Sequence, residues 1–310
     1  MAAPTNTFLS SAAVGNREDL SNIIYRIDPI DTPVFSLAAK AKATNTIHEW
    51  QTQALASAAA NAQAEGDDMT AKAVTPTVRL QNRAQISTKG VIVSGTQQAM
   101  NHAGVEDDLS NQVMLSGLEL RRDIELGLTQ NDVIGTSPRQ SRGLRGWITD
   151  NVSTGSGYVA PSAYTGTGTT TTTDGTQRAF TEALLKNVLQ SVFTAGGKPD
   201  TIVVGPAQKQ TFSTFTGNAT RMDKSEDKKL YAGIDVYVSD FGELTVVPDR
   251  FSRSRDVFVL ESEKLAVAYL RPMQEKEIAA TGDSMKRQLI VEYTLECRAP
   301  KAHGAIYDVL

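Results

Sequence analysis

The chain has 310 residues, of which 40% are hydrophobic, 21% charged and only 6% aromatic, and its formal net charge is −4. This length can bury a sizeable core and suggests about two domains, whereas the slightly acidic balance argues against a dedicated nucleic-acid binder. No run approaches the ~18 apolar residues of a membrane helix, and no secretory signal opens the chain, so we expect a protein made and kept in a cytoplasm.

The first 45 residues predict an arm with little core of its own. Residues 1–15 are small and polar, and residues 16–27 place apolar side chains on one face of a short helix. A second short helix is predicted to start at Pro33, which is favoured in a first turn, and to stop near Lys42. We therefore predict an N-terminal arm over 1–45.

Residues 46–93 predict a long two-stranded excursion with a polar tip. Residues 47–53 and 74–93 have strand composition, whereas residues 54–68 are almost without large apolar side chains. An isolated hairpin is marginal in water, so we expect this extended loop to need a partner surface. Its candidate contacts to a neighbouring subunit are Trp50, Arg79, Arg83 and Lys89.

Residues 94–177 follow, and 105–131 carry the longest helical pattern of the chain. Apolar residues recur along it at helical spacing, namely Leu109, Val113, Leu120, Ile124 and Leu128. Acidic residues at its start suit the helix dipole, and the helix should be roughly 40 Å long. Residues 151–177 are rich in Thr and Gly and predict a surface loop or flexible insertion.

Residues 178–245 predict a compact α/β unit. An amphipathic helix over 178–194 leads to a continuous apolar strand at 201–204, which we expect at the centre of a sheet. The polar stretch 217–229 is either a solvated loop or a loop that makes salt bridges between subunits. Its candidate contact residues are Arg221, Asp223, Lys224, Glu226 and Asp227. Residues 246–310 predict mainly strands, with a link over 275–282.

Residues that would carry catalysis are not grouped in the sequence. There is no Walker-type phosphate loop and no Gly-x-Ser-x-Gly nucleophile elbow. The three histidines, at 48, 102 and 303, are far apart, and Cys297 is the one cysteine. We therefore predict no enzyme activity, no cofactor, no metal site and no internal disulfide.

Several short segments resemble the major capsid, or major head, proteins of tailed bacteriophages. They are Arg26-Ile27-Asp28-Pro29, Val238-Ser239-Asp240-Phe241-Gly242, Asp256-Val257-Phe258-Val259-Leu260, Tyr269-Leu270-Arg271-Pro272, Thr281-Gly282-Asp283-Ser284, Glu292-Tyr293-Thr294-Leu295-Glu296 and Lys301-Ala302-His303-Gly304. Their order along the chain is more specific than any one of them. The order of predicted elements is also similar to that family, whose fold is shared with encapsulins and the floor of herpesvirus capsids.

The resemblance implies an α+β fold with named parts. These are an N-arm (1–45), an extended loop (46–93), a peripheral domain with a spine helix (94–177), an axial domain (178–245), and returning strands of both domains (246–310). Many relatives carry a charged scaffolding segment ahead of the arm. This sequence starts with the arm, so we expect either a separate scaffolding protein or a sequence in its final form.

The resemblance also implies a function. The chain would self-assemble as pentamers and hexamers into an icosahedral or prolate phage head around double-stranded DNA, built in the host bacterial cytoplasm and found in the virion. Expected partners are copies of itself, a portal protein and DNA bound without sequence preference, with scaffolding and decoration proteins as further candidates. The alternatives are an encapsulin-like compartment, a phage tail or fibre protein, and a soluble α/β enzyme.

Overall fold

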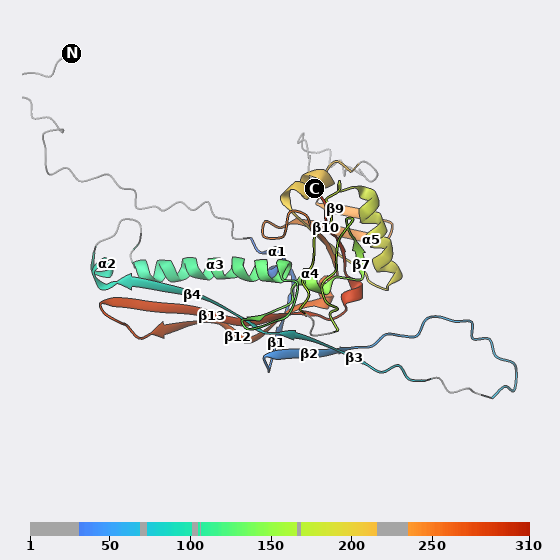
Figure 1. Ribbon diagram of the computed structural model, residues 1–310, viewed down its shortest axis with the longest axis horizontal. Helices are drawn as coiled ribbons and strands as arrows, with labels where there is room; N and C mark the ends of the chain where they lie inside the picture. Colours follow the sequence, from blue (N-terminus) through green and yellow to red (C-terminus); the bar gives the residue numbers. More distant parts are fainter. Residues whose placement is uncertain (1–30, 69–72, 101–104, 106, 166–168, 216–234) are drawn as a thin grey trace, which may run out of the picture.

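The computed structural model describes residues 31–68, 73–100, 105, 107–165, 169–215 and 235–310. Figure 1 shows a long helix lying along a long sheet, a second sheet flanked by helices, and a hairpin that extends away from both. The mixture of helices and strands agrees with the predicted α+β class. Residues 1–30, with their predicted helix at 16–27, lie outside the described residues.

A four-stranded sheet and two helices form one part, here called the peripheral lobe. Its strands, in sheet order, are β1 (Ala39–Lys42), β12 (Leu265–Ile278), β13 (Ser284–Cys297) and β4 (Gln85–Ser94). Its helices are α2 (Gly95–Ala99) and α3 (Asp108–Gln130). The Asp107 carboxylate caps α3 by accepting the Leu109 N–H, so the predicted helix starts at Asp108 and not at 105.

A six-stranded sheet forms the second part. Its strands, in sheet order, are β7 (Asn151–Ser153), β14 (Gly304–Ile306), β11 (Val257–Leu260), β8 (Thr201–Val204), β10 (Gly242–Pro248) and β9 (Val236–Ser239). Helices α5 (Glu182–Thr194) and α6 (Pro206–Phe212) accompany it. Strand β8 is buried at all four residues and has a strand on each side, as its continuous apolar run predicts.

The extended hairpin consists of β2 (Ile47–Thr52) and β3 (Val78–Arg83), paired antiparallel. Its hydrogen-bonded part is shorter than the predicted excursion over 46–93. The buried Ala84 donates its N–H to the Thr46 carbonyl at 2.8 Å, and β4 then leaves to pair with β13. Residues 85–93 therefore belong to the sheet of the peripheral lobe.

Two further elements differ from the prediction. Helix α1 ends at Leu37 instead of near Lys42, because the next residues form β1 and pair in parallel with β12. The polar link predicted over 275–282 is strand as far as Ile278, because Arg287 of β13 lies within 3.5 Å of the Glu275 and Glu277 carboxylates. Cross-strand charge pairs of this kind stabilise a sheet face that is open to solvent.

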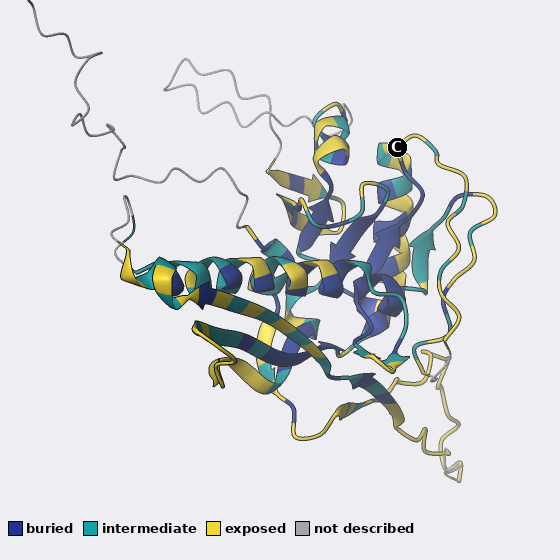
Figure 2. Cartoon of the chain, turned by 60° about the vertical axis from the view of Figure 1, so that its left-hand side comes forward, coloured by how far each residue is buried: buried dark blue, intermediate teal, exposed yellow. Residues whose placement is uncertain are grey.

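Short elements complete the connections. They are α1 (Pro33–Leu37), β5 (Gly135–Thr136), β6 (Arg139–Gln140), α4 (Leu144–Trp147) and the 3-10 turns η2 (Ser262–Lys264) and η3 (Pro300–Ala302). Two hydrophobic clusters lie on the two sides of the six-stranded sheet, one shared with α3 and the other with α5 and α6. Figure 2 shows this buried centre and the exposed residues of the hairpin. Among the described helices, none is long and apolar enough to cross a bilayer.

Candidate assembly surfaces

The root of the extended hairpin is fixed to β13 by side chains of β2. Trp50 donates its indole N–H to the Cys297 carbonyl at 3.0 Å, and its ring centroid lies 5.2 Å from that of Trp147. His48 Nε2 lies 3.1 Å from a Glu296 carboxylate oxygen. Trp50 was predicted as an intersubunit contact, and in the structure its indole contacts its own chain.

Asn82 fixes β3 at the same root. Its side chain is fully buried, and its amide donates to the Leu295 carbonyl at 2.7 Å and to the Arg142 carbonyl at 2.9 Å. Its carbonyl accepts the Arg142 N–H at 2.9 Å. One amide therefore joins the hairpin, the sheet of the peripheral lobe and the segment ahead of α4. Sequence analysis did not single out Asn82. The sequence does place this Asn at a position of β3 whose side chain points inward by the alternation of a strand, and a polar residue at such a position could have indicated its role.

Beyond this root, residues 53–77 extend without strand pairing in their described part. Leu55 is 98% exposed and Val74 is 87% exposed. Glu65, Asp67 and Asp68 are exposed as well. Exposed apolar side chains on an extension of this kind are typical of contact surfaces.

The other predicted contacts have different surroundings. Arg79 is 68% exposed and reaches Glu49 only at 3.7 Å, while Arg83 is half-buried beside the root. Lys89 lies 2.9 Å from Asp123 and 3.6 Å from Glu119 of its own α3. The hydrogen bond to Asp123 raises the pKa of Lys89. The five predicted contacts of the loop 217–229 lie outside the described residues.

The beginning of α1 is held by the spine helix α3. Glu125 is completely buried, and its two carboxylate oxygens each accept a backbone N–H, from Val34 and from Phe35, at 2.7 Å. Arg121, one turn earlier, donates to Thr32 at 3.3 Å and stacks over the Phe35 ring. This clamp fixes the point at which residues 1–30 join the folded body. Glu125 follows Ile124 of the apolar stripe, but its role was not evident from that spacing.

A cluster of charged residues fixes the Thr/Gly-rich segment predicted as a loop. Asp174 binds the guanidinium groups of Arg145 and Arg253, the latter at 2.5 Å, and lies 3.4 Å from Arg255. The hydrogen bond from Arg253 lowers the pKa of Asp174. Asp308 accepts the Gly155 and Gly175 N–H groups and Arg255 at 2.7 Å. The segment is thus tied to the six-stranded sheet at both ends.

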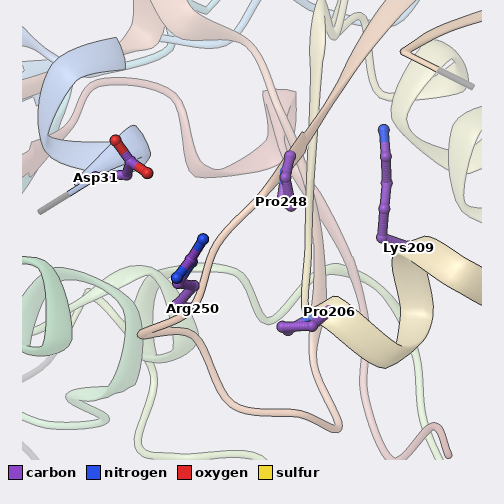
Figure 3. A pocket seen from close by; sticks show the side chains of 5 residues that line it. All are labelled: Asp31, Pro206, Lys209, Pro248 and Arg250. Atoms are coloured by element: carbon purple, nitrogen blue, oxygen red, sulfur yellow. The ribbon is translucent and has the colours of Figure 1, made fainter. Parts of the chain in front are cut away.

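A cavity of about 520 Å³ lies between the start of α1 and α6 (Figure 3). It is lined by Asp31, Pro206, Lys209, Pro248 and Arg250. The Lys209 ammonium binds Asp235 at 3.1 Å and the Val246 carbonyl at 3.0 Å, so this amine is held in salt-bridged form. These residues supply neither a nucleophile nor a paired general base.

His303 and Cys297 both lie buried in the core. Burial lowers the pKa of His303 to about 4 and raises the pKa of the fully buried Cys297 thiol well above its usual range. No group of three or more His, Cys, Asp or Glu residues within the described ranges could hold a metal ion. The distinctive features of this part of the chain are therefore its surfaces.

Known proteins match this chain over nearly its full length. The chain is 26% identical to the major capsid protein of Escherichia phage Phieco32, with 99% of this chain and 98% of that protein covered. Its fold matches the cyanophage A-1(L) capsid asymmetric unit with a TM-score of 0.68 at 14% identity, covering 97% of this chain and 98% of that one.

A solved structure from Mycobacterium phage Adephagia gives a TM-score of 0.63 at 12% identity, again with 97% of this chain and 98% of that one covered. The profile of the SU10 major capsid protein family matches residues 3–310. The chain therefore belongs to the SU10 major capsid protein family.

Proposed function

We propose that this major capsid protein closes into a shell of pentamers and hexamers, and that the extended hairpin is the principal link from each copy to the next. The observation that carries the proposal is the contrast within residues 46–83. The root is anchored by Asn82 and Trp50, whereas Leu55 and Val74 are almost fully exposed. Heterologous contacts of this kind generate rings when their rotation closes.

The hairpin extends across the neighbouring copy in this proposal. Apolar side chains such as Leu55 gain burial there, and the described backbone at 53–68 and 73–77, which pairs with no strand, gains hydrogen bonds by strand addition. Among the predicted charged contacts within the described ranges, Arg79 is the strongest, because it is exposed and only loosely paired. Trp50 and Lys89 act by positioning the hairpin and β4 within their own chain.

The remaining parts of the chain take the roles that the family resemblance implies. The unit 178–245 is the axial domain near the ring centre, with residues 217–229 facing its equivalents, and the arm 1–45 laces adjacent copies together. The shell encloses double-stranded DNA without reading its sequence, consistent with a net charge of −4. Assembly takes place in the host cytoplasm with a portal protein, and the product is the virion capsid.

A decoration protein is a further partner in this proposal. The structure of the phage G major capsid protein, which includes a gp26 decoration protein, matches this fold with a TM-score of 0.56 at 12% identity. We assign the chain a structural role and no catalytic one, in keeping with its family. An encapsulin-like compartment, which shares the fold, differs in holding a protein cargo instead of DNA.

Replacement of residues 54–76 by a short Gly-Ser turn tests the role of the hairpin. The root contacts of Asn82 and Trp50 remain in this variant, so the subunit should keep its unfolding midpoint. Light scattering and electron microscopy should show closed shells for the natural chain and only free subunits or open aggregates for the variant. Closed shells of normal yield from the shortened chain would overturn the proposed link.

A further inference from the structure

The guanidinium group of Arg142, just ahead of α4, is completely buried and has few partners. Within the described ranges its side chain makes a single hydrogen bond, from Nη1 to the Ser162 carbonyl at 3.3 Å. Its Nε and Nη2 atoms are buried without a hydrogen-bond partner. Burial lowers the pKa of Arg142, and no acidic neighbour acts against this shift. The described part of the chain therefore leaves a buried positive charge without a counter-ion.

Arg145, three residues later and also buried, shows the ordinary arrangement. Its guanidinium group binds the Asp174 carboxylate and lies 3.4 Å from Asp132 and 3.7 Å from Asp256. Buried charges are paired in this way because an unpaired charge loses its hydration without compensation. An arginine keeps its proton in a folded protein, so Arg142 cannot avoid this cost by becoming neutral. A negatively charged group from outside the chain would remove the cost.

The two nitrogens of Arg142 without partners form one edge of the guanidinium group. The N–H groups of Nε and Nη2 point in parallel, and this fork matches two oxygens of a phosphate, sulfate or carboxylate. The Trp147 ring lies 5.6 Å from the Arg142 guanidinium carbon, and the Trp147 indole N–H is also buried without a partner. A water molecule can accept hydrogen bonds from these donors, but only an anion also neutralises the charge.

We propose that Arg142 binds a small inorganic oxyanion, phosphate or sulfate, through its Nε–Nη2 edge. The surroundings favour a small ion over the side chain of another protein. Arg142 is covered by its own chain, and Ser162, which its Nη1 contacts, is itself tied to Thr170 by two hydrogen bonds of 2.9 and 3.0 Å. A polypeptide would have to displace this covering segment, whereas a single ion needs much less room.

The oxyanion site joins the root of the extended hairpin to the Thr/Gly-rich segment. The Arg142 N–H donates to the Asn82 side-chain carbonyl, and the Arg142 carbonyl accepts the Asn82 amide, both at 2.9 Å. The Arg142 side chain reaches Ser162 in the Thr/Gly-rich segment. An ion that neutralises Arg142 therefore stabilises the junction of these two segments. This site belongs to the single chain, so it does not depend on the proposed shell.

Binding of inorganic phosphate to the unassembled chain tests the site. The chain is first refolded from urea in phosphate-free chloride buffer, so that no ion retained from purification blocks the site. Equilibrium dialysis at constant ionic strength should then show one phosphate per chain. At a phosphate concentration tenfold above its dissociation constant, the equilibrium constant for unfolding in urea should fall about tenfold. Sulfate should compete with phosphate for the same site.

Variants assign the bound phosphate to Arg142. R142Q should bind none, and R142K, which keeps a charge but lacks the fork, should bind at least about tenfold more weakly. The control R271Q removes an exposed guanidinium that already pairs with Glu292 at 2.8 Å, and it should bind like the natural chain.

Two results would overturn the oxyanion site. One is the absence of saturable phosphate binding to the natural chain, and the other is equal binding by R142K, which carries the comparison if R142Q does not fold. If the natural chain binds no phosphate and a folded R142Q no longer forms shells, the partner of Arg142 is a carboxylate of another copy, and the ion site is wrong. Failure of the natural chain to form shells would overturn the proposed function and leave the phosphate result standing.

Discussion

Glu125 of the spine helix caps the N-terminus of α1 from 91 residues away, with both carboxylate oxygens 2.7 Å from the backbone N–H groups of Val34 and Phe35. Thr32 holds the usual capping position of α1 but makes no capping hydrogen bond with its side chain. The Glu125 carboxylate therefore makes the capping hydrogen bonds that the Thr32 side chain does not make. The point where the arm meets the body is thereby fixed to the centre of the peripheral lobe.

Replacing Glu125 by Ala should destabilise the subunit substantially. Two buried N–H groups would lose their acceptor, which should lower the free energy of unfolding by about 2–4 kcal/mol. Urea denaturation of the unassembled subunit measures this change. The control is E119A on the same helix, where the carboxylate is 52% exposed and pairs with Lys89 at 3.6 Å. The E119A substitution should lower the free energy of unfolding by less than about 1 kcal/mol. Equal losses in both variants would contradict the assigned role of Glu125.

Glu125 should also make stability fall between pH 4.5 and 7. Burial raises the pKa of Glu125 from 4.5 to about 7 in the folded chain. As the pH rises above 4.5, the unfolded chain loses this proton first, and the folded chain must then keep a proton or bury a charge. Stability is therefore highest at the acid end of this window and declines until the folded pKa is passed.

The E125Q variant isolates this contribution. Its unfolding free energy should lack a decline of up to about 3 kcal/mol that the natural chain shows between pH 4.5 and 7.5. The comparison must be a difference between the two chains, because other carboxyls titrate as well. Burial raises the pKa of Asp256 to about 6, whereas the hydrogen bond from Arg271 lowers that of Glu292. Identical pH profiles for both chains would refute this linkage.

Asp174 should determine how firmly the Thr/Gly-rich segment is held. In D174N, three guanidinium groups (those of Arg145, Arg253 and Arg255) would lose their shared carboxylate, and the loss of stability should be about 2–3 kcal/mol. Limited proteolysis within 154–175 should accelerate in parallel. The control D150N removes a carboxylate that is exposed and accepts one bond, from Tyr164. Unchanged proteolysis in D174N would show that the segment is held by other contacts.

Local periodicity predicted the parts of the fold whose burial is regular. The helical spacing of Leu120, Ile124 and Leu128 predicted α3, and all three are buried. The continuous apolar run of β8 predicted its central place in a sheet. In these elements one face, or the whole segment, is buried. The apolar residues therefore recur in the sequence with the period of the helix or strand that they form.

Elements that depend on distant partners could not be predicted in this way. The outer part of β12 resembles a polar link because its charges pair with Arg287 across the strand, not with sequence neighbours. Glu125 is likewise an ordinary helix residue until α1 is placed against it. The choice of candidate contact residues was limited in the same way, because their partners in the fold are distant in sequence. Charge and polarity singled out Lys89 equally with Arg79, and only the fold shows that Lys89 is already paired with Asp123.

Asn82 should be the most sensitive single residue at the root of the hairpin. The N82A variant would leave the Leu295 and Arg142 carbonyls without their donor in a fully buried position, and it should lose about 3–4 kcal/mol of stability. The matched control is Q81A, one residue earlier on the same strand and only half-buried, which should change stability little.

A second measurement distinguishes a loosened hairpin from general destabilisation. Trypsin should cut at Arg79 and Arg83 sooner in N82A than in Q81A, under conditions in which both chains remain folded. The reason is that β3 is joined to the lobe through Asn82, while β2 is joined independently through Trp50. Cleavage first within the six-stranded sheet would place the weak point elsewhere. A rigid hairpin root would then no longer explain how one copy reaches the next.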